Sequence, residues 1–269
     1  MSYLLSKNKK NDNSGLIQKV TPQSANWKYV GFEVQALAKS NSINIESLSD
    51  EICVVILSGK VDASTRSESW QNIGERMSVF ERKAPYSIYS PADDFVSLTA
   101  LTDVEIAICR APGKGGYQAK LITPEKCQYE TRGINTNTRH VCNILFANEP
   151  ADSLLVCEVI TPSGNWSSYP PHKHDTDAAP IETQLEETYY HKIDPPQGFV
   201  FQRVYNDDRS LDETMSVEDG DLVMVPEGYH PVGVPHGYQS YYLNVMAGPS
   251  RNWIFNNDPD HEWIIAQDI

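Results

Sequence analysis

Short runs of strand-forming residues, separated by turn residues, constrain the fold of this chain more than any other feature. Examples are residues 52–59 (ICVVILSG), 104–109 (VEIAIC), 153–160 (SLLVCEVI) and 199–205 (FVFQRVY). No long segment repeats its apolar residues with the 3.6-residue period of a helix. The 17 prolines and 15 glycines mark frequent turns. Together these features predict an all-β fold, either a sandwich or a barrel.

Four residues of the second half have the character of metal ligands. His172 and His174 are separated by one residue, so on a β-strand they point the same way and can bind one ion. Glu187 begins an aromatic, strand-like run, and His230 ends residues 220–230 (GDLVMVPEGYH). Three imidazoles and a carboxylate suit zinc, manganese, iron or nickel, and they leave coordination positions open for water or substrate. The pattern predicts a catalytic metal site.

The two halves of the sequence share a pattern of turns and strands. Residues 226–230 (PEGYH) precede a strand-like run from Tyr241, and residues 91–95 (PADDF) precede one from Val104. Phe95 then takes the place of His230, and no histidine occurs before His140. We therefore expect a duplicated barrel with domains at 1–125 and 126–269, only the second able to bind metal. Chance similarity between short β segments is the alternative.

The composition limits the partners of the chain. A formal net charge of −14 argues against nucleic acid and anionic membrane surfaces. Neither a signal peptide nor an apolar run of about 18 residues is present, so we expect a soluble, cytoplasmic protein. The five cysteines include no Cys-x-x-Cys pair, and we expect them to be reduced and mostly buried. An anionic substrate would need a metal or a local positive group to receive it.

The order Gly, His-x-His, Glu, Gly-x5-Pro, His resembles the cupin superfamily. More closely, residues 154–175, 195–205 and 225–232 resemble the 5-deoxy-glucuronate isomerase family of inositol catabolism. The resemblance implies a bicupin fold, with two jelly-roll barrels of which the first is degenerate. It also implies conversion of 5-deoxy-D-glucuronate to 5-dehydro-2-deoxy-D-gluconate, an aldose–ketose isomerisation. The related cupin isomerases of 5-keto-4-deoxyuronate suggest zinc as the metal.

The carboxylate ligand departs from the common cupin spacing, in which a glutamate follows His-x-His after a few residues. That window offers only Asp175 and Asp177 here. Glu182, Glu186 and Asp175 therefore compete with Glu187. We favour Glu187 because the following Thr-Tyr-Tyr-His alternates as a ligand-bearing strand should.

Other residues are candidates for catalysis and substrate binding. Tyr189 and His191 share a strand face with Glu187, and all three are candidates for moving a proton. Arg203 alternates with aromatic residues on a face expected to point inward, where its guanidinium could hold a substrate carboxylate. An ion pair with an acidic residue is the alternative for Arg203. Tyr242 could donate its hydroxyl to a sugar or pack in the core.

The mechanism expected from this site is chelation of the C1 aldehyde oxygen and C2 hydroxyl by the metal, followed by proton transfer from C2 to C1. A metal-assisted hydride shift is the alternative. Lys173 should point away from the metal, as a surface or outer-shell residue. Competing functions are isomerisation of a related keto-deoxyuronate, an iron-dependent cupin dioxygenase and a non-catalytic sugar-binding cupin. Exposed cupin strand edges often pair, which is compatible with a homo-oligomer.

Overall fold

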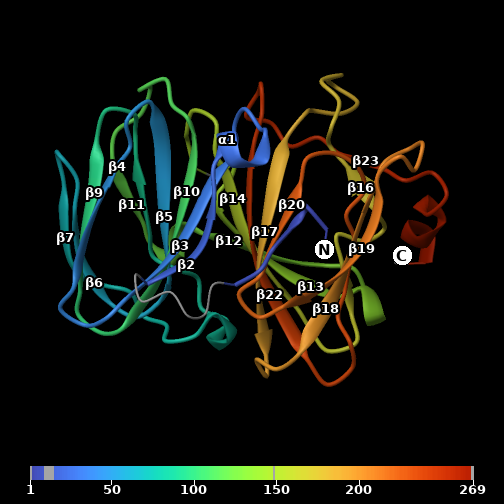
Figure 1. Ribbon diagram of the computed structural model, residues 1–269, viewed down its shortest axis with the longest axis horizontal. Coiled ribbons are helices and arrows are strands. Elements are labelled where there is room, and N and C mark those ends of the chain that lie inside the picture. Colours follow the sequence, from blue (N-terminus) through green and yellow to red (C-terminus); the bar gives the residue numbers. More distant parts are fainter. Residues whose placement is uncertain (1, 9–14, 148, 268–269) are drawn as a thin grey trace. The chain divides into compact units, whose positions relative to one another are not determined.

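The computed structural model describes residues 2–8, 15–147 and 149–267, and Figure 1 shows that strands dominate it. Its described residues contain one α-helix, α1 (Pro22–Ala25), and the 3-10 helices η1 (Val79–Glu81), η2 (Pro124–Lys126), η3 (Asn135–Asn137) and η4 (Glu262–Gln267). The predicted all-β class is confirmed. The N-terminal residues, in which a signal peptide would lie, are partly outside the described residues.

Two compact units divide the chain. The N-terminal unit comprises the described residues of 9–128 and 142–157, and the C-terminal unit comprises those of 1–8, 129–141 and 158–269. The division falls within the two strands β13 (Arg139–Leu145) and β14 (Leu155–Thr161). The expected division into domains at 1–125 and 126–269 stays a prediction.

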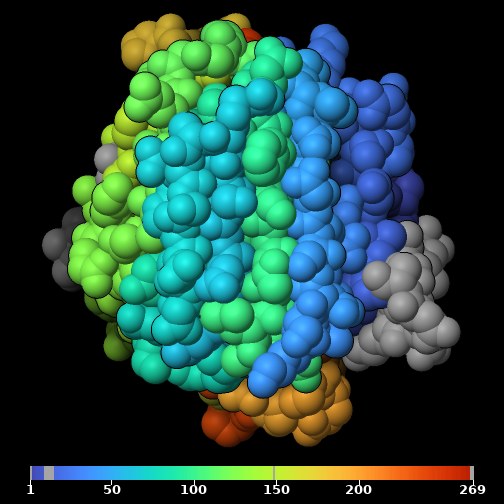
Figure 2. Space-filling view, turned by 90° about the vertical axis from the view of Figure 1, so that its left-hand side faces the viewer, coloured from blue at the N-terminus to red at the C-terminus, as the bar shows by residue number. Residues whose placement is uncertain are grey.

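The N-terminal unit contains two antiparallel sheets. The order is β11-β8-β5-β10-β3-β2 in one and β4-β9-β6-β7 in the other. Figure 2 shows the second sheet as adjacent bands of blue, green and cyan residues. The strands are β2 (Leu16–Val20), β3 (Gly31–Leu37), β4 (Ser42–Glu46), β5 (Asp50–Ser58), β6 (Val61–Ser64), β7 (Ser69–Ile73), β8 (Ser87–Ser90), β9 (Phe95–Ala100), β10 (Val104–Pro112) and β11 (Lys120–Ile122).

The C-terminal unit repeats this plan. A larger sheet has the order β1-β20-β17-β22-β14-β13-β12, a smaller one has β15-β21-β18-β19, and β16 pairs with β23. The remaining strands are β1 (Leu5–Ser6), β12 (Gln128–Arg132), β15 (Trp166–Ser167), β16 (His172–Lys173), β17 (Glu186–Asp194), β18 (Phe199–Tyr205), β19 (Asp212–Glu218), β20 (Leu222–Val225), β21 (Val232–Gly233), β22 (Gln239–Ala247) and β23 (Asn256–Asn257).

Nine strands correspond in order between the two units. In the larger sheets, β8-β5-β10-β3-β2 matches β20-β17-β22-β14-β13, and in the smaller sheets β4-β9-β6-β7 matches β15-β21-β18-β19. Phe95 starts β9, and His230 lies two residues before the corresponding β21. The topology is therefore that of a duplicated jelly roll, with Phe95 and His230 near equivalent positions.

The interiors of the two units differ in chemistry. The N-terminal core is aliphatic, and β5 contributes Ile52, Val54 and Ile56 to it. The corresponding strand β17 directs Glu187, Tyr189 and His191 to one face by the same two-residue alternation. Among the described residues, the equivalent inward positions of β5 are therefore aliphatic, whereas those of β17 carry polar side chains.

The described residues also bear on two expectations from composition. All five cysteine side chains are buried, and none forms a disulfide. No described helix is long and apolar enough to cross a membrane.

Candidate metal centre

Three histidines from two segments of the C-terminal unit converge on one point. His172 opens β16, His174 follows this two-residue strand, and His230 lies between β20 and β21. One ring nitrogen from each lies within 4.8 Å of the others, an arrangement able to hold a metal ion. Pairing of His172 with Asn257 of β23 fixes the short strand that carries the first two rings. The structure thus brings the three predicted histidines together.

Backbone carbonyl groups orient two of these imidazoles. The Nδ1 atom of His174 lies 3.3 Å from the Leu185 oxygen, and Nδ1 of His230 lies 2.8 Å from the Gly228 oxygen. A carbonyl oxygen only accepts, so each Nδ1 donates, and in the neutral rings Nε2 carries a lone pair. Such contacts fix the tautomer in which Nε2 can bind a metal.

Glu187 faces the same two imidazoles from β17. Its Oε2 lies 3.1 Å from Nε2 of His174 and 3.2 Å from Nε2 of His230, and its side chain is buried. A proton on His174 can satisfy the first contact, but Nε2 of His230 is buried and makes no hydrogen bond. A lone pair held against a carboxylate is unfavourable unless a cation lies nearby. The donor set therefore fits a divalent metal ion.

Burial and charge set the protonation of the histidines in opposite directions. Burial, reinforced by the neighbouring histidines and Arg139, lowers the pKa of His172, and burial lowers that of His230 to about 4. Burial also opposes charge on His174, but the hydrogen bond and negative charge of Glu187 outweigh it and raise its pKa. Two of the rings are thus held in the neutral form that binds metals.

The competing carboxylates lie elsewhere. Oε1 of Glu182 accepts hydrogen bonds from the backbone amides of Asp175 (2.6 Å) and Thr176 (3.0 Å). Asp175 binds Lys173 at 2.9 Å and the amide of Gly228 at 2.9 Å. Glu186 precedes Glu187 on β17, so its side chain points to the opposite face. Among the four candidates, only Glu187 has a described contact with the histidines.

Hydroxyl groups lie next to the histidines on the inner face of the sheet. The Tyr189 ring lies 5.7 Å from the His230 ring and 4.8 Å from the Tyr242 ring, between centroids. Ser168 links the two tyrosines, with its Oγ 3.0 Å from the Tyr189 hydroxyl and 3.5 Å from that of Tyr242. Both tyrosines also belong to the core of the unit. Sequence reasoning did not single out Ser168, which has no motif of its own.

His191 lies behind Tyr189 on the same strand, with ring centroids 6.1 Å apart. Its Nε2 is 3.0 Å from Oε1 of Gln202, while Nδ1 is buried and makes no hydrogen bond. Burial lowers the pKa of His191 to about 4, so the ring is neutral at ordinary pH. A neutral ring held by Gln202 is a weak base.

The expectation that Arg203 lies on the inward face of its strand is wrong. Val200, Gln202 and Val204 of β18 are fully buried, whereas Arg203 is half-exposed on the other face. Its Nε and Nη2 each donate at 2.7 Å to a different oxygen of Asp212 on β19, the ion pair considered as its alternative. Compact β-branched side chains fill the barrel, and the bulkier face of β18 turns outward.

The surroundings of the centre were only partly predicted: Lys173 points away from the histidines as expected, and Trp253 and Phe255 were not considered. Lys173 is buried rather than on the surface. The Trp253 and Phe255 rings lie 6.1 and 4.9 Å from the His172 ring. Trp253 and Phe255 come from the C-terminal segment before β23, far from the His-x-His motif in sequence. No local spacing rule could have found that contact.

A double-barrel topology with one polar, histidine-lined interior defines a bicupin. Solved structures agree on the fold: the oxalate decarboxylase of Lactobacillus farciminis covers 99% of this chain and 91% of its own, with a TM-score of 0.67 and 12% identity. An IolB-like protein from Salmonella typhimurium LT2 is much closer, with a TM-score of 0.95 and 49% identity over 98% of this chain and all of its own.

Sequence comparison is more specific than the fold. The model of the KduI/IolB family matches residues 3–264, and the chain belongs to this family. A 5-deoxy-glucuronate isomerase of Geobacillus kaustophilus HTA426 is 57% identical over 100% of this chain and 98% of its own. The 5-deoxy-glucuronate isomerase of Bacillus subtilis 168 is 52% identical over 99% of this chain and 100% of its own.

Proposed function

We propose that the protein is an aldose–ketose isomerase that converts 5-deoxy-D-glucuronate to 5-dehydro-2-deoxy-D-gluconate in myo-inositol catabolism. The convergence of His172, His174 and His230 carries the proposal, because it supplies a metal-binding donor set, and two of the three rings lie against the carboxylate of Glu187. Full-length relatives at 51–57% identity are named 5-deoxy-glucuronate isomerase, which supports this substrate. A cytoplasmic enzyme without nucleic-acid or membrane partners agrees with the net charge of −14.

Zinc is the metal we propose, with manganese, iron and nickel as alternatives. His172, His174, His230 and Glu187 would hold it. A bound divalent ion would act as a Lewis acid, polarising the substrate carbonyl and stabilising the negative charge that develops next to it. The neutral state of His172 and His230 favours binding of the ion, since a protonated ring has no free lone pair.

Glu187 is the residue we propose for proton transfer. Among Glu187, Tyr189 and His191, it alone carries a carboxylate, and Gln202 already binds Nε2 of His191. In the open-chain substrate Glu187, released from the ion, takes the proton from C2 and its carboxyl returns it to C1, while the proton of the C2 hydroxyl moves to the C1 oxygen. The hydroxyls of Tyr189 and Tyr242, oriented through Ser168, would hold the substrate oxygens during this transfer.

The substrate carboxylate needs a positive partner other than Arg203. Arg139 is close enough to His172 for its charge to contribute to the lowered pKa of that ring. The guanidinium of Arg132 lies 5.1 Å from the Trp253 ring centroid, on the ring that neighbours His172. We propose that the carboxylate binds on this side of the centre, where a guanidinium can form two parallel hydrogen bonds to it.

The proposal is tested with metal-stripped protein reloaded separately with zinc, manganese, iron or nickel. Each form is incubated with 5-deoxy-D-glucuronate and with a related keto-deoxyuronate, while ketose formation and oxygen consumption are followed. Ketose formation from 5-deoxy-D-glucuronate without oxygen uptake supports the proposal. Faster turnover of the other uronate assigns a different substrate, and oxygen uptake with iron assigns a dioxygenase.

A further inference from the structure

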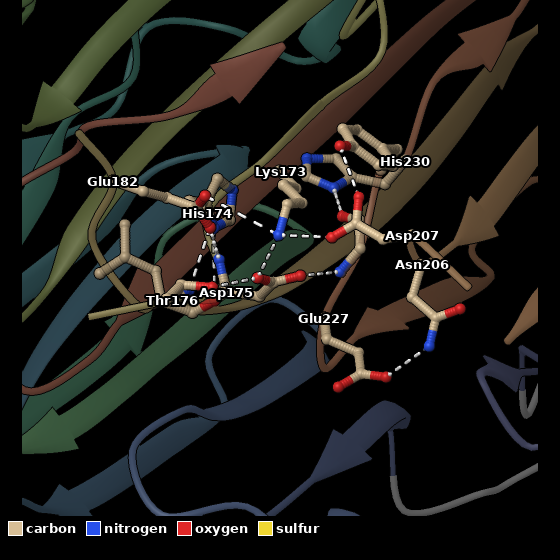
Figure 3. Close-up of polar contacts among 12 residues, drawn as sticks. Lys173, His174, Asp175, Thr176, Glu182, Asn206, Asp207, Glu227 and His230 are labelled. Atoms are coloured by element: carbon tan, nitrogen blue, oxygen red, sulfur yellow. Dashed lines mark hydrogen bonds and ion pairs between the residues drawn. The ribbon is translucent and has the colours of Figure 1, made fainter. Parts of the chain in front are cut away.

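Lys173 lies at the centre of a polar cluster next to His174 and His230, which Figure 3 shows. Lys173 is itself buried, whereas the side chain of Asp207 is 67% exposed. The residue lies between His172 and His174 in sequence, so its side chain leaves the strand on the opposite side. Its Nζ lies 2.9 Å from Asp175, 3.1 Å from Asp207 and 3.8 Å from Glu182. One ammonium group therefore faces three carboxylates from three different segments.

Each of these carboxylates holds another part of the unit. Oδ2 of Asp175 accepts the Gly228 amide at 2.9 Å, and Oδ1 of Asp207 accepts the Tyr229 hydroxyl at 2.8 Å. Glu182 accepts the two amides that follow His174, as described above. The cluster thus joins the His-x-His strand to the turn that carries His230.

The connection to His230 runs through a single peptide segment. Asp175 binds the amide of Gly228, and the carbonyl of the same glycine binds Nδ1 of His230 at 2.8 Å. Gly228 has φ of 86°, and a Cβ atom there would lie 2.4 Å from the Tyr205 oxygen. The segment is therefore closely packed, so a shift of Asp175 would be transmitted to the imidazole instead of being absorbed by the backbone.

Charge balance makes Lys173 the member that holds the cluster together. The side chains of Asp175 and Glu182 are only 15% and 5% exposed. Without the ammonium, two buried carboxylates would face each other and would separate, take up protons or admit water. Any of these changes would shift Asp175, and with it the Gly228 segment that orients His230 and the backbone that follows His174.

We propose that Lys173 is a positioning residue of the metal centre, which sets metal affinity by holding Asp175, and Asp175 fixes His230 through Gly228. This inference rests on the metal site of the proposed function but not on its substrate. Changes in groups that orient metal ligands typically reduce metal affinity about 10–100-fold. A purely structural role would instead lower the stability of metal-free and metal-loaded protein by the same amount.

The test compares Lys173→Met with Lys192→Met, a matched control on β17 whose ammonium lies 3.8 Å from Asp219. Affinity for Zn²⁺ is measured by chelator competition, the Co²⁺ form is examined by visible spectroscopy, and Tm is recorded with and without metal. We expect Lys173→Met to bind Zn²⁺ about 10–100-fold more weakly, with an altered Co²⁺ spectrum and a smaller metal-induced rise in Tm. The control should match the wild type.

Asp175→Ala provides a second variant in case Lys173→Met does not fold, because it breaks the link to Gly228 while keeping the ammonium. It should lose metal affinity to a similar extent. Wild-type affinity and Co²⁺ spectrum in either folded variant would overturn the inference, as would an equal loss in Lys192→Met. If the variants bind metal weakly but the wild type shows no isomerase activity, the proposed substrate is refuted and the role of Lys173 is still supported. A wild type that binds no metal would refute both.

Discussion

At the scale of single residues, the site depends on where each imidazole directs its two nitrogens. The backbone carbonyls of Gly228 and Leu185 accept hydrogen bonds from Nδ1 of His230 and His174. This orientation directs both Nε2 atoms toward Glu187. Glu187 lies at this meeting point because it occupies an inward position of β17. The carboxylate thereby has two roles open to it, metal binding and proton transfer.

Glu187→Gln tests this assignment. The amide keeps the shape of the side chain but loses the negative charge that faces two imidazoles, so metal affinity should fall by at least about 10–100-fold, and turnover should be lost. Metal content after dialysis and ketose formation are the measurements. Glu227→Gln, an exposed neighbour of Asn206, is the control and should behave like the wild type. Full metal retention in Glu187→Gln would show that Glu187 is not a ligand.

His191 should make stability depend on pH. Its folded-state pKa is about 4, below the ordinary value of 6.5, so in acid the unfolded chain takes up a proton that the folded chain does not. Stability is therefore lost as pH falls from about 6.5 toward 4, by ~2 kcal/mol between pH 6.5 and 5 for this residue. Urea unfolding of metal-free wild type and His191→Gln at these two pH values measures it. Equal pH dependence in the two proteins would contradict the account.

At the scale of elements, strand alternation explains both what could be predicted and what could not. The period of β17 predicts that Glu187, Tyr189 and His191 share a face, and they do. The period of β18 likewise separates Arg203 from Gln202, but it does not say which face is inside. The face that turns inward depends on the volume available between the sheets. The face with Gln202, Val200 and Val204 fits this volume better than the face with Arg203 and the aromatic residues.

The orientation of β18 gives opposite predictions for two neighbouring residues. Arg203→Met should leave KM unchanged and cost about 0–1 kcal/mol of stability, because it removes a half-exposed ion pair with Asp212. Gln202→Leu should cost about 1–3 kcal/mol, because it leaves Nε2 of His191 buried without its partner. Chemical unfolding and substrate titrations measure both. A large rise in KM for Arg203→Met would restore the original assignment of Arg203 to the substrate carboxylate.

The direction of the Lys173 side chain could be predicted from the sequence, but its burial could not. Its place between two histidines predicts that it points away from them, as it does, but its burial depends on Asp207 and Glu182. Those residues come from separate turns, and only the folded chain brings them together. Trp253 and Phe255 reach His172 for the same reason. A short motif therefore predicts the ligands, while their supporting contacts depend on the tertiary structure.

At the scale of the whole molecule, the chain repeats one topology and gives the two copies different interiors. All seven histidines fall outside the N-terminal unit, whose core is aliphatic. The duplication could be predicted from the repeated turn pattern, because turns and strands are specified locally. The division of the units within β13 and β14 could not be predicted, since it depends on which strands pair.

The asymmetry of the two units predicts the metal content. One divalent ion per chain should remain after gel filtration of zinc-loaded protein, because only the C-terminal unit brings three histidines together. Elemental analysis with protein quantified by amino-acid analysis measures the ratio. His230→Ala should reduce it to near zero. Two ions per chain, or one ion that survives in His230→Ala, would place a metal outside the described centre.

The most direct test of the proposed isomerase is proton NMR of 5-deoxy-D-glucuronate incubated with metal-loaded protein in D₂O. We expect growth of ketose signals with deuterium at C1, because Glu187 exchanges its proton with solvent before returning it. Ketose formation without deuterium would contradict proton transfer by Glu187 and favour a hydride shift. An unchanged spectrum from protein that holds its metal would contradict the isomerase assignment itself.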